Sequence, residues 1–223
     1  MPTLQNLQQV HTPVLKIAIT GGPGTGKSTV LRMFQELGAA ALDADQAAHD
    51  AVEVGKPAWE ELHAAFGPEY FREDGSLDRA KMAHLVFADP QARGCLNGIV
   101  HPRVAQEIRH RIQDLARQGA DLVMVEVPLL FEAGLEKNYD AIIVVSTETA
   151  AQADRLRTRD HREAQEISGI IQAQWPLQEK LARADYVVDN GGSLKDTRRR
   201  VKNIWEKLQK IVLTEKSKKV SVP

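Results

Sequence analysis

The segment Leu15–Thr29, with the sequence LKIAITGGPGTGKST, decides the fold. Its first part, Leu15–Thr20, is a short apolar run with β-branched residues that is bounded by glycines, which predicts a buried strand. Gly21–Ser28 then matches the pattern G-x-x-x-x-G-K-S/T without deviation. After this pattern, apolar residues recur at helical spacing, at Val30, Leu31, Phe34 and Leu37. The segment therefore predicts a strand, a glycine-rich loop and the start of a helix.

The residue types in this loop suit the binding of a triphosphate. Glycines let the backbone curl so that successive N–H groups point at an anion, and the start of the next helix adds unpaired donors. Lys27 is placed to reach the β- and γ-phosphates, and Ser28 to ligate a magnesium ion that bridges them. An ordinary glycine-rich turn is the alternative, but the complete pattern in this context favours a nucleoside-triphosphate site.

Composition and charge narrow the class of protein. The chain has 223 residues, which allows one or two domains, and its net charge of −1 provides no bulk attraction to nucleic acid or anionic membranes. The single cysteine, Cys95, excludes an intramolecular disulfide framework. No apolar run approaches the length of a membrane span, and MPTLQNLQQVHT lacks the features of a signal peptide. We therefore predict a cytoplasmic protein that binds neither nucleic acid nor membrane.

Further apolar runs predict an α/β fold, a three-layer sandwich around a mostly parallel five-stranded sheet. After the first strand, the others are predicted to end near Leu42 and to cover Asp121–Val127, Tyr139–Val145 and Asp185–Val188. The core comprises residues 15–54 and 119–212, with a helical lid at about 150–184. Residues 1–14 are predicted to be an extension, and 213–223 a basic tail whose end, from Lys216, is unstructured.

Residues 55–118 show helical patterns and predict a helical insert between the second and third strands. Helices are expected near Trp59–Phe66 and Leu77–Phe87, and a third is expected to open at His101-Pro102-Arg103, because proline suits a first helical turn. An insert at this place suits the binding of an acceptor, although it could serve packing alone. His101 and Arg103 are candidates for contacting an anionic acceptor, or else a boundary residue and a solvated charge.

Two carboxylates follow the second strand, at Asp43 and Asp45. The carboxyl ends of parallel strands line the ligand crevice, so either side chain could accept a proton from an attacking hydroxyl or hold magnesium through water. Alternatively, one of them caps the helix that begins near Ala44. Glu126, within the third strand, is a candidate magnesium partner or a paired polar residue.

Two polar helices, Thr147–Asp160 and about Glu163–Ala184, are joined by a basic turn and resemble a lid. Arginines such as Arg155 and Arg159 on a closing lid would neutralise charge on a transferring phosphoryl group. The alternative is a solvated helix face.

Several motifs occur in an order that resembles the dephospho-coenzyme A kinase family, from about residue 16 to 210. They are TGGPGTGKST, LDAD, DGSLDR followed by VF.D and LN.IVHP, then VPLLFE, Q..RL..RD and QWPLQEK..RADYVVDNGGSL. The resemblance implies transfer of the γ-phosphoryl group of ATP to the 3′-hydroxyl of dephospho-coenzyme A, with Mg²⁺ present. The substrates would be ATP and dephospho-coenzyme A.

The resemblance also implies roles for single residues. Asp45 would be the catalytic base, assisted by Lys27 and the lid residue Arg159. The ATP site would comprise Gly24, Thr25, Gly26, Lys27, Ser28, Thr29, Arg155 and Asn190, with Ser28 on the metal. The acceptor site would comprise Asp45, His101, Pro102, Arg103, Leu129 and Leu130. The lid departs from the family pattern at Ile170, often an arginine, and at the turn DHRE, where Arg162 is a candidate replacement charge.

Two alternatives stay open at this point. A different small-metabolite or nucleoside kinase would share the core. A nucleotide-dependent switch would share the loop, but the chain lacks a strand ending in D-x-x-G and an N-K-x-D segment.

Overall fold

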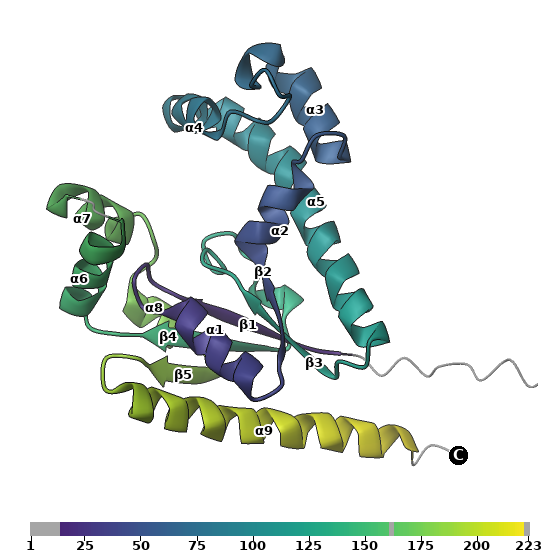
Figure 1. The fold of residues 1–223 in the computed structure, drawn as a ribbon, viewed down its shortest axis with the longest axis vertical. Coiled ribbons are helices and arrows are strands. Elements are labelled where there is room, and N and C mark those ends of the chain that lie inside the picture. Colours follow the sequence, from purple (N-terminus) through teal and green to yellow (C-terminus); the bar gives the residue numbers. More distant parts are fainter. Residues whose placement is uncertain (1–13, 161–162, 221–223) are drawn as a thin grey trace, which may run out of the picture.

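Five strands form one fully parallel sheet in the order β2-β3-β1-β4-β5 (Figure 1). The computed structural model describes residues 14–160 and 163–220, with backbone alone at 159–160 and 218–220. The strands are β1 Leu15–Gly21, β2 Ala40–Asp43, β3 Leu122–Glu126, β4 Ala141–Ser146 and β5 Tyr186–Asp189. The five strands and the parallel sheet predicted from the sequence are confirmed.

Helices cover both faces of the sheet, because side chains alternate along each strand. In β1, Ile17 and Ile19 face α1 (Lys27–Glu36) and α9 (Leu194–Val220), whereas Ala18 faces the opposite layer. That second layer contains Ile112 of α5 (Pro90–Arg117) and partly buried residues of α8 (Leu177–Leu181). The result is the predicted three-layer sandwich.

The insert stands away from the sheet, connected to it through α2 (Ala44–Ala51) and α5 (Figure 1). It contains α3 (Pro57–Phe66), the short η1 (Pro68–Tyr70) and α4 (Arg79–Ala88), packed against the first half of α5. Its own small core centres on Val52, Ala58 and Leu62. The insert is therefore a second lobe with separate packing.

The prediction that a helix opens at His101-Pro102-Arg103 is wrong. That helix, α5, begins at Pro90, where Asp89 accepts hydrogen bonds from the backbone N–H groups of Gln91 and Ala92, and Pro102 lies inside it. An interior proline removes one helical hydrogen bond, but packing against α2, α3 and α4 holds the helix together. Local preference is overridden here by tertiary contacts.

The segment that was predicted to be a lid contains α6 (Thr149–Asp160) and α7 (Ala164–Gln172). The single helix predicted from Glu163 to Ala184 is in fact α7 and α8, separated at Trp175-Pro176, because proline lacks an N–H and disfavours helix in the residue before it. After β3 the chain passes through η2 (Glu136–Asn138) to β4.

The C-terminal helix is longer than the sequence suggested. α9 continues to Val220, so the predicted unstructured tail is helical this far, and Lys216 pairs with Asp121 over 2.6 Å. In the part of the chain that the structure describes, none of the helices has the length and apolar character needed to cross a membrane.

Candidate functional site

The phosphate loop is tightly curled between β1 and α1. Gly26 has a positive φ of 89°, and the Thr25 hydroxyl donates to the Gly22 carbonyl over 2.9 Å. Lys27 is only 9% exposed, and its Nζ donates to the carbonyl oxygens of Gly21 at 3.2 Å and Gly22 at 3.1 Å. The ammonium group is thus held against the loop beside the N-terminus of α1, where anions are stabilised.

Two side chains from distant segments of the chain donate hydrogen bonds to the backbone of the phosphate loop. Arg155 of α6 donates through Nη1 to the carbonyls of Gly24 and Thr25, at 3.3 and 3.2 Å, and through Nη2 to the carbonyl of Asn190 at 2.9 Å. The Asn190 amide donates to the Thr25 carbonyl over 2.8 Å and accepts from Thr197 over 3.1 Å. Both residues were predicted to bind nucleotide, and the structure places both against the loop backbone.

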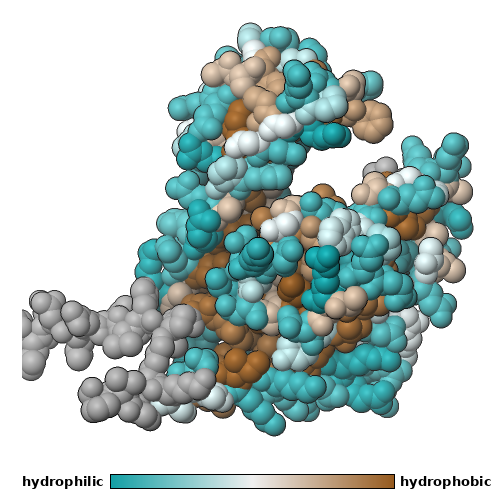
Figure 2. Space-filling model, turned by 180° about the vertical axis from the view of Figure 1, so that it is seen from behind, coloured by the Kyte–Doolittle hydropathy of each residue, from teal (hydrophilic) through white to brown (hydrophobic). Residues whose placement is uncertain are grey.

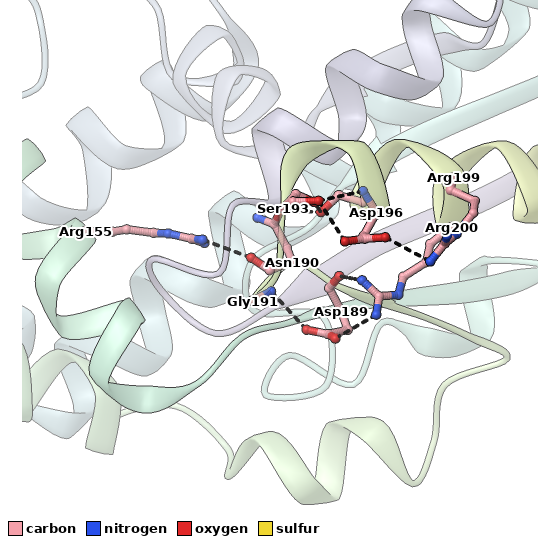
Figure 3. A network of polar contacts seen from close by, with 9 residues as sticks. Arg155, Asp189, Asn190, Gly191, Ser193, Asp196, Arg199 and Arg200 are labelled. Atoms are coloured by element: carbon pink, nitrogen blue, oxygen red, sulfur yellow. Dashed lines mark hydrogen bonds and ion pairs between the residues drawn. The ribbon is translucent and has the colours of Figure 1, made fainter.

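The segment that carries Asn190 is itself held by polar contacts (Figure 3). Asp189 accepts from the backbone N–H of Gly191 at 2.9 Å and pairs with Arg200 at 3.1 Å. Ser193 donates to Asp196 over 2.7 Å at the start of α9. The turn after β5 therefore forms a fixed support for the loop.

Gly26 has two separate reasons to be glycine. Its φ of 89° lies in the region that side chains rarely adopt, and an added Cβ would collide with Nδ2 of Asn190. The close approach of Asn190 to the loop thus depends on the missing side chain.

The structure separates the roles of the two carboxylates after β2. Asp43 is the N-cap of α2, with its Oδ1 accepting from the backbone N–H groups of Asp45 at 2.8 Å and Gln46 at 3.3 Å. Asp45 lies in the first turn of α2 and lines the cavity beside the loop. Capping is therefore the work of Asp43, and the Asp45 carboxylate is left for another role.

A second carboxylate lies next to the loop serine. Glu126, at the end of β3, is buried, and Ser28 Oγ donates to its Oε1 over 3.1 Å. Burial raises the pKa of Glu126, while Lys27 and the Ser28 hydrogen bond oppose that rise. Removal of surrounding water also raises the pKa of Asp45, the charge of Asp43 raises it further, and Lys27 lowers it. Two carboxylates with raised pKa values thus flank one lysine.

These groups line a cavity of about 770 Å³ between the phosphate loop, the start of α2, the end of β3, α6 and the link between α7 and α8. Figure 2 shows, from behind, the notch that separates the upper lobe from the body. The lining residues include Gly24, Gly26, Lys27, Ser28, Thr29, Asp43, Asp45, Glu126, Arg155 and also Pro128, Asp154, Thr158 and Gln174. The last four were not predicted from the sequence as site residues, although Pro128 lies in VPLLFE, Asp154 and Thr158 occupy unspecified positions of Q..RL..RD, and Gln174 opens QWPLQEK.

The residues predicted to bind the acceptor are not gathered at this cavity. His101 and Pro102 are exposed in the middle of α5. Arg103 donates through Nε to Glu61 of α3 over 3.1 Å, and it lines a different cavity of about 470 Å³ between α3 and α5. In this conformation Arg103 therefore ties two helices of the insert together.

Two further predicted contacts also differ in environment. Leu129 is 49% exposed, whereas Leu130 is fully buried in the core beneath the sheet, so its side chain does not face a cavity. The side chain of Arg159 lies outside the described residues, although its backbone belongs to α6.

A P-loop on a parallel five-stranded sheet, with a candidate base beside the loop and a second helical lobe, defines a P-loop kinase. The sequence model of dephospho-CoA kinase matches residues 15–196. A dephospho-CoA kinase of Syntrophotalea carbinolica is 44% identical over 195 residues, covering 87% of this chain and 92% of that protein. One from Geobacillus kaustophilus is 42% identical, covering 88% of this chain and 99% of the relative. The chain belongs to the dephospho-CoA kinase family.

Two solved structures have a similar fold, and one of them is a dephospho-CoA kinase. The protein TT1252 from Thermus thermophilus has a TM-score of 0.76 and 37% identity, covering 87% of this chain and 98% of its own. A dephospho-CoA kinase from Campylobacter jejuni has a TM-score of 0.66 and 25% identity, covering 87% of this chain and 97% of its own.

Proposed function

We propose that this enzyme transfers the γ-phosphoryl group of ATP to the 3′-hydroxyl of dephospho-coenzyme A, which gives coenzyme A and completes its synthesis. Membership of the kinase family supports this activity. The structural observation that carries it is the position of Asp45. Asp43 caps α2, so the cap does not occupy the Asp45 carboxylate. Asp45 lines the same cavity as Lys27 and the phosphate loop.

The reaction is a direct displacement. The acceptor 3′-oxygen forms a bond to the γ-phosphorus, the bond from that phosphorus to the β–γ bridging oxygen breaks, and ADP leaves. Asp45 orients the hydroxyl and takes its proton, and its raised pKa makes the carboxylate a stronger base than an ordinary aspartate. Lys27 stabilises the β- and γ-oxygens, while Arg155 keeps the loop in shape.

The donor set also fits a magnesium ion. Magnesium prefers oxygen ligands, and Ser28 Oγ lies 3.1 Å from Glu126 Oε1 in a cavity that Asp43 and Asp45 also line. We propose that Ser28 contacts the ion, with Glu126 as a partner directly or through water. When bound, the ion would neutralise charge on the β- and γ-oxygens.

The orientation of α6 indicates which of its arginines can reach the cavity. Positions 154, 155 and 158 line the cavity, and position 159 continues that helical face, whereas Arg157 pairs with Asp154 over 3.7 Å. We propose that Arg159 assists transfer. Arg159→Ala should lower kcat, and the matched Arg157→Ala variant should not; equal losses in both variants would contradict the assignment.

The acceptor is proposed to lie between the cavity and the insert, with His101, Pro102 and Leu129 as candidate contacts. Because His101 is exposed, His101→Ala should leave the Tm unchanged. It should raise the KM for the acceptor without changing the KM for ATP. An unchanged acceptor KM would remove His101 from the acceptor site.

A coupled assay tests the activity itself. ADP release is measured with ATP and dephospho-coenzyme A, and the position of the new phosphate is determined by ³¹P NMR. Adenosine, shikimate and gluconate serve as competing acceptors. No phosphorylation of dephospho-coenzyme A, or a faster reaction with another acceptor, would contradict the proposal. The cytoplasmic location stays a prediction from the sequence.

A further inference from the structure

Lys180 of α8 is a charged residue that lies entirely inside the protein. Its side chain is 0% exposed, and its Nζ lies 2.7 Å from Oε1 of Glu132 and 3.1 Å from Oε1 of Gln174. A buried ammonium group is costly unless it is paired and hydrogen-bonded, and both conditions are met here. The proposed reaction gives Lys180 no role, so its burial calls for another explanation.

Glu132 connects this lysine to the core of the enzyme. It lies in the segment after β3 that contains the cavity residue Pro128, and its Oε1 also accepts from the backbone N–H of Trp175 over 2.9 Å. Burial tends to raise the pKa of Glu132, but the hydrogen bonds from Lys180 and Trp175 outweigh burial and lower it. The lowered pKa favours the ionised carboxylate of Glu132 opposite Lys180.

Trp175 is also fixed through its ring. Phe131 stacks on it with centroids 6.0 Å apart and planes inclined by 14°, and the Arg183 guanidinium lies 4.7 Å from its centroid. The link between α7 and α8 is thus held from three sides, next to the place where Gln174 enters the cavity.

Lys180 also determines which end of the Gln174 amide faces the cavity. An ammonium group has donors only, so it must meet the oxygen of the amide and not the nitrogen. Because Oε1 accepts from Lys180, the Nε2 amino group is directed away from it, and Gln174 lines the same cavity as the phosphate loop. Among the residues that the structure describes, no acceptor for Nε2 is seen.

We infer that Gln174 is a further substrate-contacting residue, which donates from Nε2 to a phosphate oxygen, and that Lys180 and Glu132 position it. This inference rests on the proposed function. Both substrates carry phosphate groups, so the shared chemistry is an anionic phosphate oxygen, either of ATP or of the acceptor diphosphate. Lys180 contacts Gln174 directly, and Glu132, in the segment after β3, pairs with Lys180. The position of Gln174 therefore depends on a residue of the core.

Variants at Gln174 test the contact directly. Gln174→Leu has a similar volume but no donor, and Gln174→Glu keeps an oxygen for Lys180 while turning a second oxygen toward the phosphates. Each should lower kcat/KM by about tenfold or more, with the larger loss in Gln174→Glu. Gln174→Glu should not lower the Tm because it keeps an acceptor for Lys180, whereas Gln174→Leu removes one acceptor from a buried ammonium group and should lower the Tm. Gln178→Leu, an exposed glutamine on α8, is the matched control and should match wild type.

The kinetic constants identify the phosphate. A rise in the KM for ATP alone indicates the nucleotide, and a rise in the KM for dephospho-coenzyme A alone indicates the acceptor. Full activity of Gln174→Leu and Gln174→Glu would overturn the inference. Wild-type enzyme without activity on dephospho-coenzyme A would instead contradict the proposed function, so the two failures are distinct.

A mutant cycle tests the positioning role. Lys180→Met/Glu132→Gln removes both charges at nearly constant volume, so it avoids leaving one buried charge unpaired. This variant should lose activity as Gln174→Leu does, and adding Gln174→Leu to it should cause no further loss. Full activity in the double variant, or losses that multiply, would refute positioning. If the double variant does not fold, Gln174→Glu decides, because it leaves the ion pair intact.

Discussion

Replacing Asp45 by asparagine should abolish most of the turnover while leaving the fold intact. Asparagine has nearly the same shape but cannot accept the hydroxyl proton at neutral pH. General bases contribute about 10²- to 10⁴-fold to rate, so kcat should fall by that factor. The capping bonds of α2 go to Asp43, so they survive the substitution.

The same substitution, Asp45→Asn, should lower turnover but increase stability, because of the electrostatics of the site. The pKa of Asp45 is raised by loss of water and by the nearby charge of Asp43, so its ionised form is disfavoured in the folded state. Neutralising the side chain should therefore raise the Tm slightly at neutral pH. A residue that served structure alone would lower the Tm when replaced.

The same raised pKa makes a prediction about pH. The base must be deprotonated to act, so kcat/KM should fall as the pH drops through the pKa of Asp45. Because that pKa is raised, the fall should occur at higher pH than for an ordinary aspartate. The acidic limb should disappear from the residual activity of Asp45→Asn.

The assay combines steady-state rates with ATP and dephospho-coenzyme A, nucleotide binding by calorimetry and thermal unfolding. The expected result is lost turnover, nearly unchanged ATP affinity and an equal or higher Tm. Turnover above a tenth of the wild-type value would refute the assignment of Asp45 as base. Loss of turnover together with a lower Tm would indicate a structural role.

Three further substitutions give distinct outcomes. Asp43→Asn keeps the cap but removes a charge, so the Tm should hold while the acidic limb of kcat/KM moves to lower pH; an unmoved limb would show that Asp43 does not influence Asp45. Gly26→Ala should destabilise the protein by at least about 1–3 kcal/mol and abolish ATP binding, because of its positive φ and the contact with Asn190; a soluble variant with normal affinity for ATP would contradict this geometry. Phe34→Ala, at a side chain that is 0% exposed, should lower the free energy of unfolding by about 3–5 kcal/mol in urea titrations; a much smaller loss would mean that the layer between α1 and the sheet repacks.

The sequence was most informative where local patterns and tertiary structure agree. The strand, loop and first helix were predictable because Leu15–Thr20 is apolar and because Gly26 permits a positive φ beside a lysine. The remaining strands were also predictable, since strands buried on both faces appear as nearly continuous apolar runs. Here short segments carry the structural information by themselves.

Where the structure depends on distant partners, the sequence was less informative. Pro102 indicated a helix start, yet packing of α5 against three other helices tolerates it inside the helix. Two aspartates in LDAD were candidates for the cap, and they are distinguished by the extended backbone of Asp43, with φ −109° and ψ 120°, and by the hydrogen bonds that its side chain accepts. Gln174 could not be recognised as a cavity residue because its position depends on Lys180 and Glu132.

The ionised carboxylates in the cavity, which the proposed reaction needs, destabilise the folded protein. Asp45 and Glu126 both have raised pKa values, so the folded state prefers them protonated, and the stability they contribute is lost as pH rises through those values. The positive charge of Lys27 opposes the rise in the pKa of both Asp45 and Glu126. A divalent cation that binds with the nucleotide would oppose this rise further, and would therefore stabilise the folded enzyme by mass action. We expect Mg²⁺ and ATP together to raise the Tm more at pH 8 than at pH 5, because a larger fraction of the carboxylates is charged at the higher pH; a larger rise at pH 5 would refute this account of the carboxylates.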